Sequence, residues 1–85
     1  MNQETLDKLA KASNAEELRR AIEALCRPFG SLKNVQLLPN KHPEEYMCFV
    51  EFDSPNRNQS VIEKLGGINF GNSVVFRIPF KQAKG

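Results

Sequence analysis

The stretch that decides the fold is Glu45-Tyr46-Met47-Cys48-Phe49-Val50-Glu51-Phe52. Its residues alternate in the way that is typical of a strand with one buried face. One side would carry Cys48, Val50 and Phe52, and the other side would carry Met47, Phe49 and Glu51. We expect the first side to face a hydrophobic core and the second side to face solvent or a ligand.

The segments around this strand predict a small α+β domain. A capping box made either by Ser13 with Glu16 or by Asn14 with Glu17 opens a helix with one apolar stripe, and Pro28 ends it. The remaining expected elements are a strand over Leu32–Leu38, the strand over Glu45–Phe52, which we call the octamer strand, a helix from Ser54-Pro55 to Gly66-Gly67, a turn over residues 69–73, and a strand over Val74–Phe80.

The octamer is similar to the K/R-G-F/Y-G/A-F-V-x-F/Y signature of the RNA recognition motif (RRM). Phe49, Val50 and Phe52 match it, Cys48 is a small residue where Gly or Ala is usual, and residues 45–47 do not match. Two further strings stand at RRM-like offsets, namely Phe29-Gly30-Ser31-Leu32 and Leu65-Gly66-Gly67. The resemblance implies a ferredoxin-like antiparallel sheet packed on two helices, in the order β-α-β-β-α-β.

The first strand of that order is the uncertain part of the prediction. In an RRM it lies between the octamer strand and the last strand, antiparallel to both, and carries a stacking aromatic. Here Thr5 takes the place of that aromatic, and Leu6, Leu9 and Ala10 recur at helical spacing. Residues 5–12 therefore fit either a strand or an N-terminal helix, and their propensity favours the helix.

A missing first strand would change the sheet. The octamer strand and the last strand would then pair directly and in parallel, through a right-handed crossover, in a sheet of three strands. Such a sheet exposes a long edge, which the N-terminal helix or a second copy of the chain would cover.

The resemblance implies that single-stranded RNA binds weakly on the open face of the sheet. Phe49 would stack on a base with Met47 beside it, and Arg77, Asn34 and Gln36 would contact phosphate or base edges. Glu45 stands where the family usually has a cation, so a lysine there would be expected to tighten binding.

The competing interpretation is a protein–protein interaction or homodimerisation module that uses the same apolar face. Met47 lacks the flat ring that makes base stacking favourable, and Glu45 repels phosphate, so both residues favour a protein partner. In this interpretation Arg77 pairs with a glutamate and a partner covers Phe49.

Composition and length bear on the number of domains, on binding partners and on cellular location. The 85 residues are expected to form one domain over 1–85 with a polar tail over 81–85, and the net charge of +2 is too small to indicate nucleic-acid binding by itself. No apolar run approaches the ~18 residues of a membrane span. We expect a cytoplasmic protein whose two thiols, Cys26 and Cys48, stay reduced in the core.

The sequence gives no sign of catalysis. It contains no G-x-S-x-G, H-E-x-x-H or P-loop motif, and His42 has no partner at metal-ligand spacing. We therefore expect no enzymatic activity, no cofactor and no metal. The scattered cations that would form a basic rim are Lys33, Lys41, His42, Arg57, Lys81 and Lys84.

Overall fold

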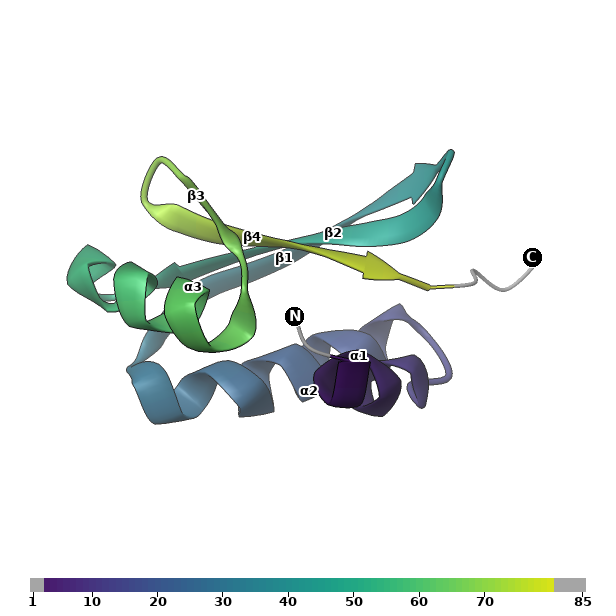
Figure 1. Ribbon diagram of the computed structural model, residues 1–85, viewed down its shortest axis with the longest axis horizontal. Helices are drawn as coiled ribbons and strands as arrows, with labels where there is room; N and C mark the ends of the chain where they lie inside the picture. The colour runs from purple at the N-terminus through teal and green to yellow at the C-terminus, as the bar shows by residue number, and fades with distance from the viewer. Residues whose placement is uncertain (1–2, 81–85) are drawn as a thin grey trace.

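A computed structural model describes residues 3–80. Its elements are α1 (Gln3–Ala10), α2 (Ala15–Cys26), β1 (Leu32–Lys41), β2 (Glu44–Phe52), α3 (Asn58–Leu65), β3 (Ile68–Phe70) and β4 (Ser73–Pro79), with 3₁₀ turns at Arg27–Phe29 and Pro55–Arg57. The four strands form one antiparallel sheet in the order β1-β2-β4-β3. Figure 1 shows the helices on one side of this sheet and the other face bare. The predicted RRM-like α+β class is confirmed.

The two sides of β2 are those that its alternation predicts. Cys48, Val50 and Phe52 are at most 1% exposed and pack in one core with the buried side chains of α2. Met47 and Phe49 are partly exposed on the opposite side. The octamer strand therefore contributes one side to the core and the other side to the bare face of the sheet.

Helix α2 begins and ends at the residues that the sequence marks. The Asn14 side chain accepts a hydrogen bond of 2.9 Å from the Glu17 amide, and the Glu17 carboxylate accepts one of 2.9 Å from the Ser13 amide. Asn14 with Glu17 is thus the pair that caps the helix. The helix ends at Cys26, two residues before Pro28, whose ring and missing N–H do not suit a helix interior.

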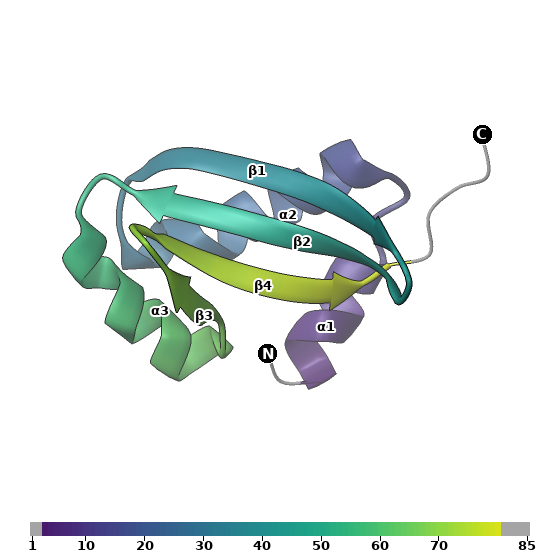
Figure 2. The same cartoon turned by 90° about the horizontal axis from the view of Figure 1, so that it is seen from above.

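The N-terminal segment is a helix, as its propensity favours, and not the first strand of an RRM. Leu9 is 1% exposed and belongs to the core, while the polar side chains on either side of it are exposed. Helix α1 contacts α2 and β4, and both views place it beside the C-terminal half of β4 (Figures 1 and 2). No helix between residues 3 and 80 is long and apolar enough to cross a membrane.

The prediction of a three-stranded sheet with a parallel pair was wrong. β4 runs antiparallel to β2, because the short strand β3 reverses the chain just before β4 begins. A two-residue turn at Gly71-Asn72 joins β3 to β4, and Gly71 supplies the positive φ (60°) that such a turn needs at its first position. β4 thereby takes the position and direction expected of the missing first strand, and β3 takes the outer position (Figure 2).

Gly67 lets this hairpin lie close to the core. A Cβ atom at this residue would lie 2.5 Å from a methyl carbon of Val74 and 2.8 Å from a ring carbon of Phe76. Both distances are shorter than van der Waals contact, so the connection from α3 to β3 requires glycine for steric reasons.

Candidate nucleic-acid interface

The bare face of the sheet, called the open face below, carries all five residues predicted to contact RNA. Direct cross-strand partners share a face. Gln36 lies opposite Phe49, and Phe49 lies opposite Val75. Met47 lies opposite Arg77. Asn34 lies opposite Glu51, two residues along β1 from Gln36 and therefore on the same face. Phe49, Met47, Arg77, Asn34 and Gln36 are thus brought together, and their contact with RNA stays a prediction.

A shallow apolar hollow of about 280 Å³ lies on the open face. We call it the aromatic pocket; its lining residues are Met47, Phe49, Ile68, Phe70, Val75 and Arg77. The rings of Phe49 and Phe70 stand edge to face, with centroids 6.1 Å apart and planes at 72°. This separation and this angle are those of a favourable aromatic pair.

Ile68 and Phe70 are the site residues that sequence reasoning missed. Both belong to β3, in a segment predicted to be largely a turn, and they are 63% and 67% exposed. The signal was present in Gly71-Asn72, a dipeptide that favours a tight hairpin between two apolar runs. Both line the aromatic pocket, and large exposed apolar side chains that gather in one patch are typical of a binding surface.

A polar network that spans three strands borders the aromatic pocket. Arg77 donates from Nε to the Glu45 carboxylate at 3.1 and 3.3 Å, and its Nη2 lies 3.0 Å from Oε2. Asn40 donates to the same carboxylate at 3.1 Å. Glu45 is only 5% exposed, whereas the Arg77 side chain is 53% exposed. The pairing of Arg77 with a glutamate, which the sequence left open, is what the structure shows.

This network changes how Glu45 is expected to affect RNA binding. Hydrogen bonds from Asn40 and from Arg77 hold the pKa of Glu45 below its usual value, so the carboxylate is ionised at neutral pH. Its charge is matched by the guanidinium that it holds. Glu45 therefore presents a paired carboxylate to an approaching phosphate, and its repulsion is weaker than the sequence suggests.

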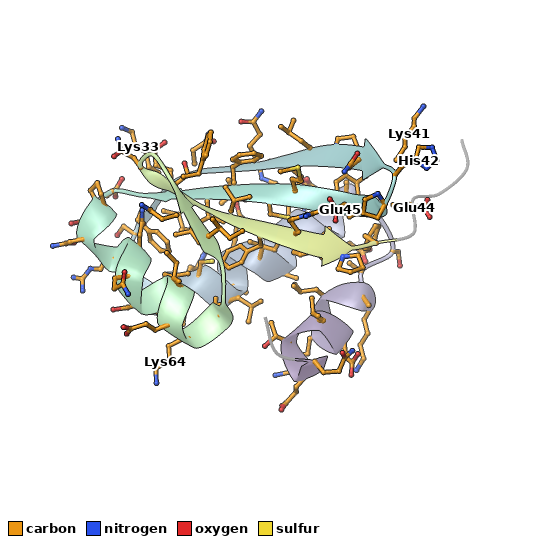
Figure 3. All side chains as sticks on the ribbon, turned by 45° about the horizontal axis from the view of Figure 1, so that its top comes forward. Lys33, Lys41, His42, Glu44, Glu45 and Lys64 are labelled. Carbon is orange, nitrogen blue, oxygen red and sulfur yellow. The ribbon has the colours of Figure 1, made fainter. Side chains whose placement is uncertain are left out.

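The cations of the predicted basic rim that Figure 3 labels, Lys33, Lys41 and His42, are not gathered in one patch. Lys33 lies 3.8 Å from the Glu51 carboxylate at the start of β1, while Lys41 and His42 lie at the other end of that strand (Figure 3). Lys64, which is not part of the predicted rim, projects from α3 away from the sheet (Figure 3). Lys81 and Lys84 lie outside the described residues. Charge alone therefore does not mark the open face as a nucleic-acid site.

Two other features of the molecule suit nucleic-acid binding or catalysis less well. A hollow of about 540 Å³ beside the end of α2 is lined by Glu23, Arg27, Gly30, Ser31 and Leu32, and it has no aromatic side chain for a base to stack on. Burial raises the pKa of the Cys26 thiol to about 11 and that of Cys48 to about 12. Both thiols are therefore neutral at physiological pH and are poor nucleophiles.

The family assignment follows from a comparison with protein-family models. The model described as RNA recognition motif matches residues 14–75, from the cap of α2 into β4. Searches of the curated protein sequences and of the solved structures return no match. Domains of the matched family are RNA-binding modules that typically have no enzymatic activity. The matched region covers most of the chain and the fold agrees with it, so the chain belongs to the RNA recognition motif family.

Proposed function

We propose that this protein binds single-stranded RNA weakly on the open face of its sheet. The observation that carries the proposal is the aromatic pocket, in which Phe49 and Phe70 stand edge to face on a bare sheet surface. Stacking of a base on an aromatic side chain contributes about 1–3 kcal/mol. One or two such contacts support weak binding in the absence of a cationic surface.

The charges of the open face predict the salt dependence of this binding. Both glutamates of β2 on this face are paired with cations, Glu45 with Arg77 and Glu51 with Lys33. RNA binding loses affinity with salt in proportion to the number of phosphates that the protein neutralises. We therefore expect a shallow salt dependence, of about one or two phosphate contacts.

The test is an NMR titration of the ¹⁵N-labelled chain with a pool of random single-stranded RNA hexamers at low salt. We expect amide shifts in β2, β3 and β4 around Phe49, Phe70 and Val75, and none around Lys64 on α3. The absence of any shift at millimolar RNA would refute the proposal.

The second candidate is the protein-interaction module, in which the same face buries against a protein or a second copy of the chain. The exposure of Ile68 and Phe70 on β3, with Leu38 43% exposed on β1, favours it. Light scattering on the RNA-free protein decides between the two: a dimer whose open-face amides are unaffected by RNA supports the second candidate, and a monomer that shifts with RNA supports the first.

A further inference from the structure

We propose that the aromatic pocket prefers guanine, and that Arg77 reads the O6/N7 edge of that base while Glu45 positions Arg77. This inference rests on the proposed RNA binding and names the base that the same site takes. It follows from the way in which the guanidinium is held at the border of the pocket.

Among residues 3–80, the pairing with Glu45 leaves one end of the Arg77 guanidinium without a partner. Nε and one N–H of Nη2 point to the carboxylate, at 3.0–3.3 Å. Nη1 makes no hydrogen bond to any residue between 3 and 80. A guanidinium has five N–H groups in a planar fork, so the far ends of Nη1 and Nη2 present two parallel donors.

Those two donors suit a base with two adjacent acceptors. Guanine presents O6 and N7 side by side, and the bidentate contact of arginine with this pair is the commonest base-specific contact in protein–DNA complexes. In single-stranded RNA the same edge is accessible, because the base is not enclosed in the deep, narrow major groove of an RNA duplex. Adenine presents N7 beside an N6 donor, which would face an arginine N–H, so adenine is disfavoured.

Arg77 lines the aromatic pocket together with Phe49 and Phe70, so one base can contact both kinds of group. The ring would stack on an aromatic side chain while its edge points to Arg77. Glu45 is 5% exposed and also accepts a hydrogen bond from Asn40, so its carboxylate is fixed on the sheet and fixes the plane of the guanidinium in turn. Preorganisation of this kind converts a flexible arginine into a directional donor.

The experiment compares pentamers of the form UUNUU, in which N is guanine, inosine, 7-deazaguanine or adenine, by NMR titration of the whole chain. Inosine keeps O6 and N7, and 7-deazaguanine lacks N7. We expect guanine and inosine to bind equally and about five- to hundredfold more tightly than adenine, with 7-deazaguanine close to adenine. Guanosine monophosphate alone should bind at least tenfold more weakly than the guanine pentamer, because it lacks the neighbouring nucleotides.

The variants separate base reading from charge and from fold. Arg77→Lys keeps the charge and loses the fork, so it should remove the preference for guanine, with guanine affinity falling to the level of adenine affinity in the same variant. Glu45→Gln should reduce the ratio of guanine to adenine affinity in the same direction, which a merely loosened fold would not do selectively. Lys64→Ala, a cation on α3 that projects away from the sheet (Figure 3), is the matched control and should change neither affinity.

Each other result overturns the inference. Equal binding of all four pentamers leaves the proposed RNA binding intact and refutes the preference for guanine. An Arg77→Lys variant that weakens all four equally shows that Arg77 does not discriminate between the bases, which refutes base reading by this residue. Free nucleotide that binds as tightly as the pentamer shows a nucleotide site and not an RNA site. If no pentamer binds at low salt, the proposed function itself fails, and the inference fails with it.

Discussion

The two faces of the sheet are built on different principles, and β2 shows both within one strand. On the core face the side chains of Cys48, Val50 and Phe52 are buried in an apolar cluster to which all three α-helices contribute. On the open face Glu45 is almost as buried as they are, yet it is held by Arg77 and Asn40 from the neighbouring strands. The core face depends on what packs over it, whereas the open face depends on which strands lie side by side.

The largest effect is expected for Phe52→Ala, on the core face. Phe52 is 1% exposed and lies in the core, so its truncation should cost about 3–5 kcal/mol of unfolding free energy. That is a large part of the stability of a domain of this size. Urea denaturation measures the loss, and Phe52→Leu, which leaves a smaller cavity, serves as the milder variant if the alanine variant does not fold. A loss under 1 kcal/mol for Phe52→Ala would contradict the assignment of this side to the core.

Leu9→Ala tests whether the N-terminal helix belongs to the core face. Leu9 is 1% exposed, although α1 is only eight residues long and would not be stable alone in water. We expect a loss of about 2–5 kcal/mol in unfolding free energy and faster amide exchange throughout α1. Leu6→Ala, at a half-buried residue of the same helix, should cost less. Equal and small effects of the two substitutions would mean that α1 does not cover the core.

Phe49→Ala tests whether the open face binds RNA. Its ring is partly exposed and borders the aromatic pocket, so its removal should affect ligand binding more than stability. We expect RNA affinity to fall by about five- to a hundredfold, equivalent to the loss of one stacked base, while the urea midpoint changes less than for Phe52→Ala. Phe70→Ala should have a smaller effect of the same kind. Unchanged RNA affinity in Phe49→Ala would place the ligand elsewhere.

The sequence predicts the core face well because that face is encoded locally. Alternation in β2 and the cap of α2 each depend on residues within one segment, and the structure has them as predicted. Even the N-terminal helix is visible in the spacing of Leu6, Leu9 and Ala10.

The chemistry of the open face was harder to predict because it depends on register between distant segments. Glu45 and Arg77 are 32 residues apart and meet only because Met47 pairs with Arg77 in an antiparallel β2–β4 ladder. The parallel pairing expected from the missing first strand would have separated them. The error has one cause, the overlooked strand β3 before Gly71-Asn72, and the same oversight hid Ile68 and Phe70.

Glu45→Lys separates the two descriptions of the open face. Sequence comparison alone predicts tighter RNA binding, because the family usually has a cation at this position. The structure predicts the opposite, since the new ammonium would lie against the Arg77 guanidinium and would leave it unfixed. We expect a melting temperature lower by several degrees, no gain in RNA affinity and loss of any preference for guanine. Glu44→Lys, at an exposed neighbour on the same strand, is the control for added positive charge. Tighter binding by Glu45→Lys alone would show that phosphate approaches this residue directly.

The smallest expected effect is the response of the Glu45–Arg77 pair to acid. Hydrogen bonds from Asn40 and Arg77 lower the pKa of Glu45 from its usual 4.5 in the folded chain. A carboxyl group whose pKa is lower in the folded than in the unfolded state stabilises the fold above the unfolded value, and this contribution is lost as the pH falls through the folded value. The contribution of this pair to stability, and the base preference, should therefore be flat between pH 7 and about 5, and the contribution should be lost as the pH falls below 4.5. Subtracting the stability profile of Glu45→Gln from that of the wild type isolates the contribution, because the other carboxyl groups are common to both. A difference that already changes between pH 7 and 5 would mean that the Glu45 pKa is raised, and that Arg77 does not hold its carboxylate in solution.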